Sequence, residues 1–246
     1  MPRKYTLKEY VADYHYHVFN RGVNKRPIFL DDQDYGVFLG YLKSYLLPVD
    51  KEKLTEILVN PKSSYGEKNK AQQALTRNNF CDEIQLMAYV LMINHFHFIL
   101  KQKDAISMQK FMRSLMTRYS IYFKERHRWS GPIFESAYKA IAVLTDEQLW
   151  HLTRYIHRNP LGGRSFSKQQ VELMRTLLKS QPSSYPVYLN ETEQKWVKPE
   201  LVLSNFSESG FNSYRDFVEE TDSDHEAAEQ EIIDKLTIDP NQESPV

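Results

Sequence analysis

Two apolar, β-prone runs that meet at an asparagine constrain the fold of this chain more than any other feature of its sequence. The first run covers residues 84–93, and the second begins at Asn94 with the sequence NHFHFIL. Runs of this composition predict the two strands of a hairpin, with a tight turn near Ile93 and Asn94. Side chains alternate between the faces of a strand, so His95 and His97 should share one face while the phenylalanines point to the other.

The histidine pair has the spacing of a metal site. Residues i and i+2 on one strand face lie roughly 7 Å apart, and two such imidazoles can converge on a cation about 2.1 Å from each nitrogen. A single strand histidine is usually a polar residue satisfied by the backbone, whereas a pair that occupies one face points to metal binding and to a structural role about equally. Two imidazoles do not complete a site, so a third ligand has to come from elsewhere in the chain.

Composition narrows the class of protein. The 246 residues allow one large domain, or one domain with an appendage, and the 41% hydrophobic content is enough for a core. The lone cysteine, Cys81, excludes intramolecular disulfides and cysteine-rich zinc sites, so we expect a reducing, cytoplasmic setting. No apolar run approaches the roughly 20 residues that span a bilayer, and no apolar signal core follows the first residues, so no membrane partner is expected.

Charge is unevenly distributed along the chain, although the net charge is zero. Residues 107–164 are rich in lysine and arginine, whereas the chain from residue 207 onward is dominated by aspartate and glutamate. A basic middle suggests a polyanionic partner, although a solvated helix face is the commoner explanation for charge alone. The acidic tail is expected to be flexible or loosely helical.

The order of predicted elements indicates the fold class. We expect a strand at 14–20, a helix at 32–46, the hairpin at 84–102, a helix at 107–126 capped by Ser107, a strand at 137–143, and a helix at 148–158 that Thr145 caps and that stops before Pro160. This β-α-β-β-α-β order is the split βαβ, ferredoxin-like plan, an α+β fold with an antiparallel sheet and helices on one face. His95 and His97 would then lie on a central strand, and the last helix could border the free face of the sheet.

Three regions are expected along the chain. Residues 1–165 form the catalytic domain, interrupted at 48–82 by a polar insertion that is partly helical at 54–58 and 71–75. Residues 166–205 form a C-terminal accessory segment with a helix near 168–179. Residues 206–246 form the acidic, flexible tail, with a small packed piece near 211–218.

The predicted helix at 148–158 offers the rest of a site. Tyr155 and Asn159 are four residues apart, so they lie on one helix face. A metal held by His95 and His97 could take Asn159 as its third, oxygen-donating ligand, with Tyr155 as a nucleophile for a phosphodiester. A phenol with a pKa of about 10 needs a nearby cation, which the metal or the arginines at 154 and 158 could supply. Because the chain has sixteen tyrosines, an ordinary amphipathic-helix residue is the favoured explanation of Tyr155 on spacing alone, and Asn159 can be a helix-terminal residue before Pro160.

Four short motifs in this order resemble a known family. They are YHV-x-NRG at 16–22, AYVLMINHFH at 88–97, FESAYK at 134–139 and YIHRNP at 155–160. Together they resemble the REP-associated tyrosine transposases, a group of the HUH single-tyrosine, IS200-like transposases. The resemblance covers about residues 10–165 and, more weakly, the Ser-Ser-Tyr sequence at 183–185. The long insertion at 48–82 and the acidic tail depart from the family's pattern.

The resemblance implies an enzyme with the HUH endonuclease type of ferredoxin-like fold and a C-terminal extension. His95 and His97 would bind Mg²⁺ or Mn²⁺, Asn159 would complete the metal site, and Tyr155 would be the catalytic nucleophile. The implied activity is cleavage and joining of single-stranded DNA near hairpins through a 5′-phosphotyrosine intermediate, by a monomer or a homodimer. Phosphate contacts are expected from Arg21, Lys25, Arg26, Arg113, Arg118, Arg154 and Arg158.

Two other interpretations stay open at this point. One is a catalytically idle protein that binds hairpin DNA or RNA on the same fold, although the strand histidines are spaced for metal rather than for stacking on bases. The other is a zinc site, because His15 and His17 make a second pair of the same spacing on a strand expected beside His95 and His97.

Overall fold

The protein is built on an antiparallel sheet with the predicted strand order. A computed structural model describes residues 10–164, 166–207, 213–220, 232–234 and 236. Strands β1 (His15–Arg21), β2 (Ile84–Met92), β3 (His95–Gln102) and β4 (Lys139–Val143) form the sheet in the order β2-β3-β1-β4, and each neighbouring pair is antiparallel. With helices inserted after β1 and β3, this is the ferredoxin-like α+β plan, so the predicted fold class is confirmed.

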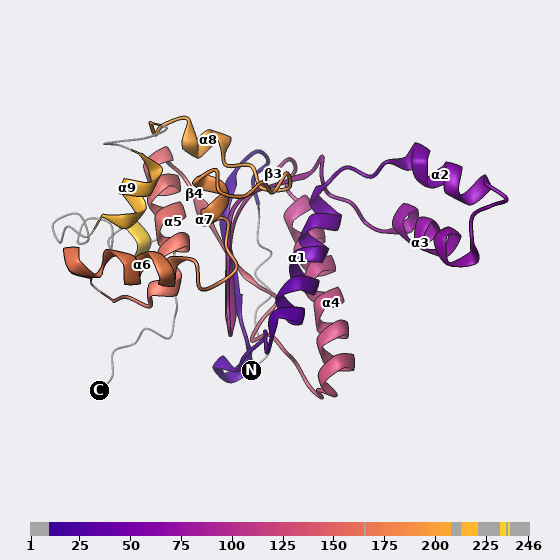
Figure 1. The fold of residues 1–246 in the computed structure, drawn as a ribbon, viewed down its shortest axis with the longest axis horizontal. Helices are drawn as coiled ribbons and strands as arrows, with labels where there is room; N and C mark the ends of the chain where they lie inside the picture. The colour runs from indigo at the N-terminus through magenta and orange to yellow at the C-terminus, as the bar shows by residue number, and fades with distance from the viewer. Residues whose placement is uncertain (1–9, 165, 208–212, 221–231, 235, 237–246) are drawn as a thin grey trace.

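One face of the sheet is covered by α1 (Asp32–Leu46) and α4 (Ser107–His127), which lie side by side in Figure 1. Most of the strand residues directed at this layer are apolar, and Val18, Phe96 and Phe98 are completely buried. The phenylalanines of the NHFHFIL sequence therefore build the core, and their alternation leaves the histidines on the opposite face.

The opposite face is covered by helices from the C-terminal half. Helix α5 (Asp146–Arg158) continues into the short 3₁₀ turn η2 (Asn159–Leu161), and α6 (Val171–Leu178) and α9 (Tyr214–Glu219) pack beyond it (Figure 1). A second apolar cluster, which includes Ile99, Leu152 and Ile156, joins this layer to the sheet. The helix after the last strand thus borders the histidine face, as the sequence predicted.

Helix caps explain where the main helices begin. Asp31 accepts hydrogen bonds from the backbone at the start of α1, and the Thr145 hydroxyl accepts one from Gln148 N at 3.1 Å at the start of α5. The prediction that Ser107 caps α4 is wrong. Ser107 is the first helical residue, and the Asp104 carboxylate accepts from its backbone N–H at 3.0 Å, because an aspartate three residues upstream reaches the exposed N–H groups.

The polar insertion forms an arm of two helices that projects away from the sheet (Figure 1). Its helices are α2 (Lys51–Val59) and α3 (Tyr65–Thr76), and within them only Ala71 is buried. The root of the arm is closed by Asn79, whose side chain donates to the Leu47 carbonyl at 2.7 Å. The arm is therefore an appendage to the fold and not part of its core.

The accessory segment covers the β2 edge of the sheet. It contains η3 (Lys168–Gln170), α6, α7 (Tyr185–Tyr188) and α8 (Glu200–Leu203). Leu91 N donates to the Pro182 carbonyl at 2.9 Å, Ser184 N donates to the Tyr89 carbonyl at 3.0 Å, and Lys198 N donates to the Leu86 carbonyl at 2.8 Å. The strand at the sheet border is thus paired with chain that follows it by about a hundred residues.

Parts of the expected flexible tail are packed. Helix α9 lies in the piece predicted near 211–218, and its Tyr214 and Val218 are buried against the α5 layer. Farther on, Ile233 and Leu236 are also buried, with exposures of 3% and 1%. Residues 208–212, 221–231, 235 and 237–246 of the predicted tail lie outside the described residues. No helix in the described part of the chain is long and apolar enough to cross a membrane.

Candidate active site

The sheet face that α5 covers carries four histidines from two adjacent central strands. In the β1–β3 pairing, Phe19 stands opposite His97 and Arg21 opposite His95. Because β1 alternates as β3 does, His15 and His17 point to the same face as His95 and His97. The Phe19 ring stacks on both His17 and His97, with ring centroids 4.7 and 5.5 Å away, and fixes the planes of these two imidazoles.

Tyr155 reaches this face from α5. Its ring stands edge-on to the His97 ring at 5.6 Å and to the His17 ring at 6.2 Å. Leu152 and Ile156 are completely buried on the sheet side of α5, whereas Tyr155 is only half-buried beside them. The helix thus holds the phenol ring next to the imidazoles and not in the apolar core.

Asn159 meets His95 one turn farther along the helix. Its Oδ1 lies 3.0 Å from His95 Nε2. The other ring nitrogen, His95 Nδ1, lies 2.7 Å from Asn94 Oδ1, and the Asn94 amide is oriented by its own N–H, which donates to the Lys25 carbonyl at 3.0 Å. Nδ1 must therefore donate to Asn94, and in the neutral ring Nε2 presents a lone pair toward Asn159.

This arrangement fits a divalent cation. The two atoms that face each other across 3.0 Å, a ring nitrogen and an amide oxygen, are both acceptors, so a cation or a proton between them is needed to satisfy both. Neighbouring ligands of an octahedral ion with bonds of about 2.1 Å are themselves about 3 Å apart. His95 and Asn159 therefore suit two adjacent positions of one hard metal ion.

A sharp turn after β1 brings Lys25 to Asn94. Gly22 N donates to the Asn94 carbonyl at 2.8 Å, and the chain then folds back through η1 (Val23–Lys25). A Cβ at Gly22 would lie 2.1 Å from the Arg26 carbonyl oxygen, so no residue but glycine fits this close approach. Gly22 thus supports the orientation of His95 indirectly. It permits the turn that places the Lys25 carbonyl, this carbonyl orients the Asn94 amide, and the amide accepts from His95.

His97 is held by a second histidine. Its Nδ1 lies 2.8 Å from His17 Nε2, and His17 Nδ1 lies 2.6 Å from the Leu236 carbonyl oxygen. His97 Nε2 has no hydrogen-bond partner among the described residues. Burial lowers the pKa of His17 to about 4 despite the Leu236 carbonyl, and burial, with the nearby His17 and His95, holds the pKa of His97 well below 6.5.

The second histidine pair does not assemble a zinc site. His17 uses both ring nitrogens in the hydrogen bonds to His97 and Leu236, and the buried His15 Nε2 has no partner in the part of the chain that the structure describes. Among the described residues, no group of three His, Cys, Asp or Glu side chains is placed to hold a metal ion. His95, His97 and Asn159 lie near one another instead: His95 Nε2 is 3.0 Å from Asn159 Oδ1, and the ring centroids of His95 and His97 are 5.1 Å apart.

The two arginines of α5, Arg154 and Arg158, hydrogen-bond to the backbone of α9. Arg154 Nε donates to the Phe217 carbonyl at 2.6 Å, and Arg158 donates to the Val218 carbonyl at 2.8 Å. These guanidinium groups bind the end of α9, and Arg154 is only 3% exposed. Phosphate contact at Arg154 and Arg158 stays a prediction, in competition with these backbone carbonyls.

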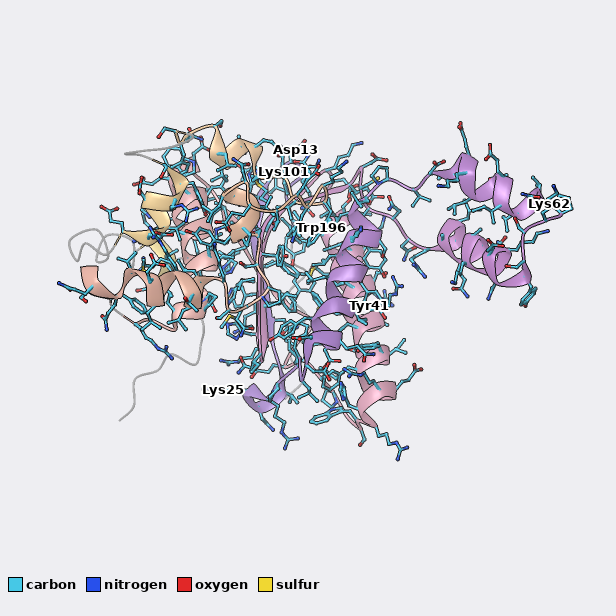
Figure 2. All side chains as sticks on the ribbon, viewed as in Figure 1. Asp13, Lys25, Tyr41, Lys62, Lys101 and Trp196 are labelled. Carbon is cyan, nitrogen blue, oxygen red and sulfur yellow. The ribbon has the colours of Figure 1, made fainter. Side chains whose placement is uncertain are left out.

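The other predicted phosphate contacts lie in different parts of the molecule. Arg21 pairs with Glu135 at 3.2 Å, and Arg118 lies 3.8 Å above the Tyr41 ring between α1 and α4. Lys25, Arg26 and Arg113 are exposed. Lys25 lies at the end of the sheet where β3 begins, opposite the end marked by Lys101 in Figure 2, so it is on the same side as His95.

Sequence reasoning missed three contributors to this geometry. Asn94 was interpreted only as a turn residue, His17 as scaffold or a zinc ligand, and Leu236 had no role. The adjacency of Asn94 to His95 and the alternation of His17 with His15 were local signals for the first two. The contact of Leu236 joins residues 219 positions apart, for which the chain carries no local pattern.

Part of the chain matches a known protein family. Residues 65–159 match the family model described as "Transposase IS200 like". The resemblance to the IS200-like transposases is confirmed. The IS200-like stretch covers less than half of the chain, from the first residue of α3 to Asn159, and so includes His95, His97 and Tyr155. It supports a transposase-like function for the chain.

One solved structure also aligns with the chain. It is described as "Structure of the REP associates tyrosine transposase bound to a REP hairpin", and the alignment covers 77% of this chain and 93% of that one, at 12% identity and a TM-score of 0.45. A comparison with curated proteins gave no match.

Proposed function

We propose that this chain is a metal-dependent tyrosine transposase, a single-stranded DNA endonuclease and strand transferase that cleaves and rejoins DNA near hairpin elements. The observation that supports it most is the Tyr155 ring, edge-on to His97 at 5.6 Å and one helical turn from Asn159. The IS200-like match over the same residues supports the assignment.

Tyr155 is the nucleophile in this proposal. Its oxygen forms a bond to phosphorus as the bond to the DNA 3′ oxygen breaks, which leaves a 5′-phosphotyrosine link and a 3′-hydroxyl. The phenol gives up one proton and the departing 3′ oxygen gains one, so no external reactant is consumed. Because the phosphotyrosine keeps a diester, a 3′-hydroxyl can later attack it and release Tyr155, which joins the strand.

His95, His97 and Asn159 are the residues that would hold Mg²⁺ or Mn²⁺. The donors are the lone pair of His95 Nε2, the amide oxygen of Asn159 and His97 Nε2, which no described residue meets with a hydrogen bond. When bound, such a cation would polarise the scissile phosphate and offset charge on its non-bridging oxygens. Nitrogen and oxygen donors suit either ion, so the donor set does not choose between the two.

The test is the covalent adduct. A labelled single-stranded oligonucleotide with a hairpin is incubated with the full chain and Mn²⁺ or Mg²⁺, then run on a denaturing gel. The unaltered protein should give a protein-linked band, and Tyr155→Phe should give none because its ring has no oxygen to attack phosphorus. Tyr65→Phe is the matched control, since Tyr65 is 87% exposed on the arm and should leave the adduct unchanged.

The outcomes separate the two functions. An adduct that survives Tyr155→Phe rejects Tyr155 as the nucleophile. Tight hairpin binding by the unaltered chain, with no cleavage and no adduct under either metal, would instead support a catalytically idle DNA- or RNA-binding protein.

A further inference from the structure

We infer that His17 is a positioning residue for the metal ligand His97: through His17, the Leu236 carbonyl fixes which nitrogen of His97 carries the proton. The inference deepens the proposed function and rests on it for the role of His97. The hydrogen-bond chain itself runs from the C-terminal segment, through β1, to the metal-binding strand β3.

The direction of the chain starts at Leu236. A backbone carbonyl oxygen can only accept, so the contact of 2.6 Å requires His17 Nδ1 to carry a proton. His17 is completely buried, and a charged imidazole there would lack water and a counter-charge, so the ring is neutral with a bare Nε2. Each neutral imidazole has one donor and one acceptor, and His17 has now used its donor.

The proton on His17 Nδ1 determines the direction of the hydrogen bond between His17 and His97. His17 Nε2 has to accept, so its partner at 2.8 Å, His97 Nδ1, has to donate. His97 is itself only 7% exposed, and in its neutral form the proton on Nδ1 leaves Nε2 with a lone pair. Nε2 is the nitrogen with no partner among the described residues, so the relay presents a ready metal donor at that position.

Free histidine prefers the opposite form, with its proton on Nε2. Without His17, His97 would lose both the acceptor that retains its Nδ1 proton and a neighbour that fixes its ring plane. Partners of this kind orient metal-binding histidines and raise their basicity, and their loss typically weakens metal affinity about 10- to 100-fold. His17 touches neither substrate nor metal in this scheme, and it acts only through His97.

The tautomer can be observed directly without any variant. In the metal-free full chain labelled with ¹⁵N-histidine, long-range ¹H–¹⁵N correlations distinguish a protonated from a bare ring nitrogen. We expect His17 and His97 both to carry their proton on Nδ1, with His97→Gln used to assign the His97 signals. A proton on His97 Nε2 would overturn the inference, whether or not the protein cleaves DNA.

Manganese affinity without DNA gives the second readout. His17→Phe should weaken Mn²⁺ binding about 10- to 100-fold, and His17→Gln should recover part of the loss because an amide can both donate and accept. His15→Phe is the matched control: His15 lies on the same face of β1 and its buried Nε2 has no partner, so Mn²⁺ binding should not change.

The outcomes distinguish this inference from the proposed function. Unchanged Mn²⁺ affinity in His17→Phe, or an equal loss in His15→Phe, overturns the role of His17. If the unaltered chain binds no Mn²⁺, the metal part of the proposed function fails, and the ¹⁵N spectrum still decides the direction of the relay.

Discussion

At the residue scale, each of the two β3 histidines of the candidate site is held by a chain of polar groups that ends on the backbone. His95 donates to Asn94, which donates to the Lys25 carbonyl, and His97 donates to His17, which donates to the Leu236 carbonyl. Carbonyl oxygens cannot reverse their role, so the backbone sets the direction of both chains. Which ring nitrogens of His95 and His97 carry protons thus depends on where the backbone lies at Lys25 and Leu236.

Lys25 is the exposed cation from which we expect the clearest DNA phenotype. Lys25→Gln should weaken single-stranded DNA binding and lower the slope of log affinity against log salt by about 0.7 to 0.9, the amount expected for one lost phosphate contact. The measurement is a salt titration by fluorescence anisotropy. Lys62→Gln, at the far tip of the arm in Figure 2, serves as the control with equal change in charge. Equal slopes for the two variants would remove Lys25 from the phosphate contacts.

At the element scale, the Ser184 hydroxyl and the His157 imidazole together join β2, α5 and α9. Ser184 Oγ accepts from Tyr89 N of β2 at 2.9 Å and lies 2.8 Å from His157 Nε2 of α5, while His157 Nδ1 lies 2.7 Å from the Tyr214 hydroxyl of α9. His157 and Ser184 are completely buried, so these bonds have no water to replace them. Helix α5, which carries Tyr155, is thus attached to the edge strand and to the C-terminal layer by the same imidazole.

Ser184→Ala tests this junction. The change leaves a buried backbone N–H and a buried ring nitrogen without a partner, so the free energy of unfolding should fall by about 1–3 kcal/mol. Urea denaturation followed by tryptophan fluorescence measures it. Ser204→Ala, which removes an exposed hydroxyl bonded to the nearby Leu201 carbonyl and to the exposed Asn205 amide, should change stability by less than about 0.5 kcal/mol. Equal stabilities for the two variants would contradict the proposed junction.

Elements with a strong local pattern were predictable from sequence. The alternation in β1 and β3 and the helical spacing in α1, α4 and α5 placed these elements within a few residues of their observed bounds. The cap of α4 was not predictable in the same way, because serine at the start and aspartate three residues earlier compete for the same N–H groups.

The candidate site also combines residues that a local sequence pattern identifies with hydrogen bonds that no local pattern predicts. The pairs at i, i+2 on β3 and i, i+4 at the end of α5 are local, so His95, His97, Tyr155 and Asn159 could be selected from spacing and resemblance. The hydrogen bonds that orient them were beyond sequence reasoning. They depend on where the turn after β1 and the segment near residue 236 are packed, and both are set by tertiary contacts.

At the scale of the whole molecule, the arm and the histidine face of the sheet are separate. The arm leaves the sheet on the side of α1 and α4, whereas Tyr155 and the histidines lie under α5 on the other side (Figure 1). The arm also starts beyond the end of β3 that carries Lys101, far from the His95 end (Figure 2). It adds little to the buried core, since α2 contains no buried residue.

Excision of the arm should therefore leave the fold intact. Replacing residues 49–77 with a short glycine-serine linker should change the free energy of unfolding by less than about 1 kcal/mol, because loop closure depends weakly on length and the Asn79–Leu47 contact still closes the root. Circular dichroism during urea denaturation measures the change, and the Tyr155 adduct assay reports on the site. A loss of several kcal/mol would show that the arm belongs to the folding unit.

The strand at the sheet border has a consequence for how copies of this chain meet. β2 is nine residues long and mostly apolar, with the sequence IQLMAYVLM, the kind of ribbon that recruits strands from other molecules when its backbone groups are unoccupied. Pro182, Ser184 and Lys198 already occupy those groups at Leu91, Tyr89 and Leu86. The accessory segment thus blocks the addition of a strand from another molecule at β2. Edge-to-edge aggregation through β2 requires this segment to detach first.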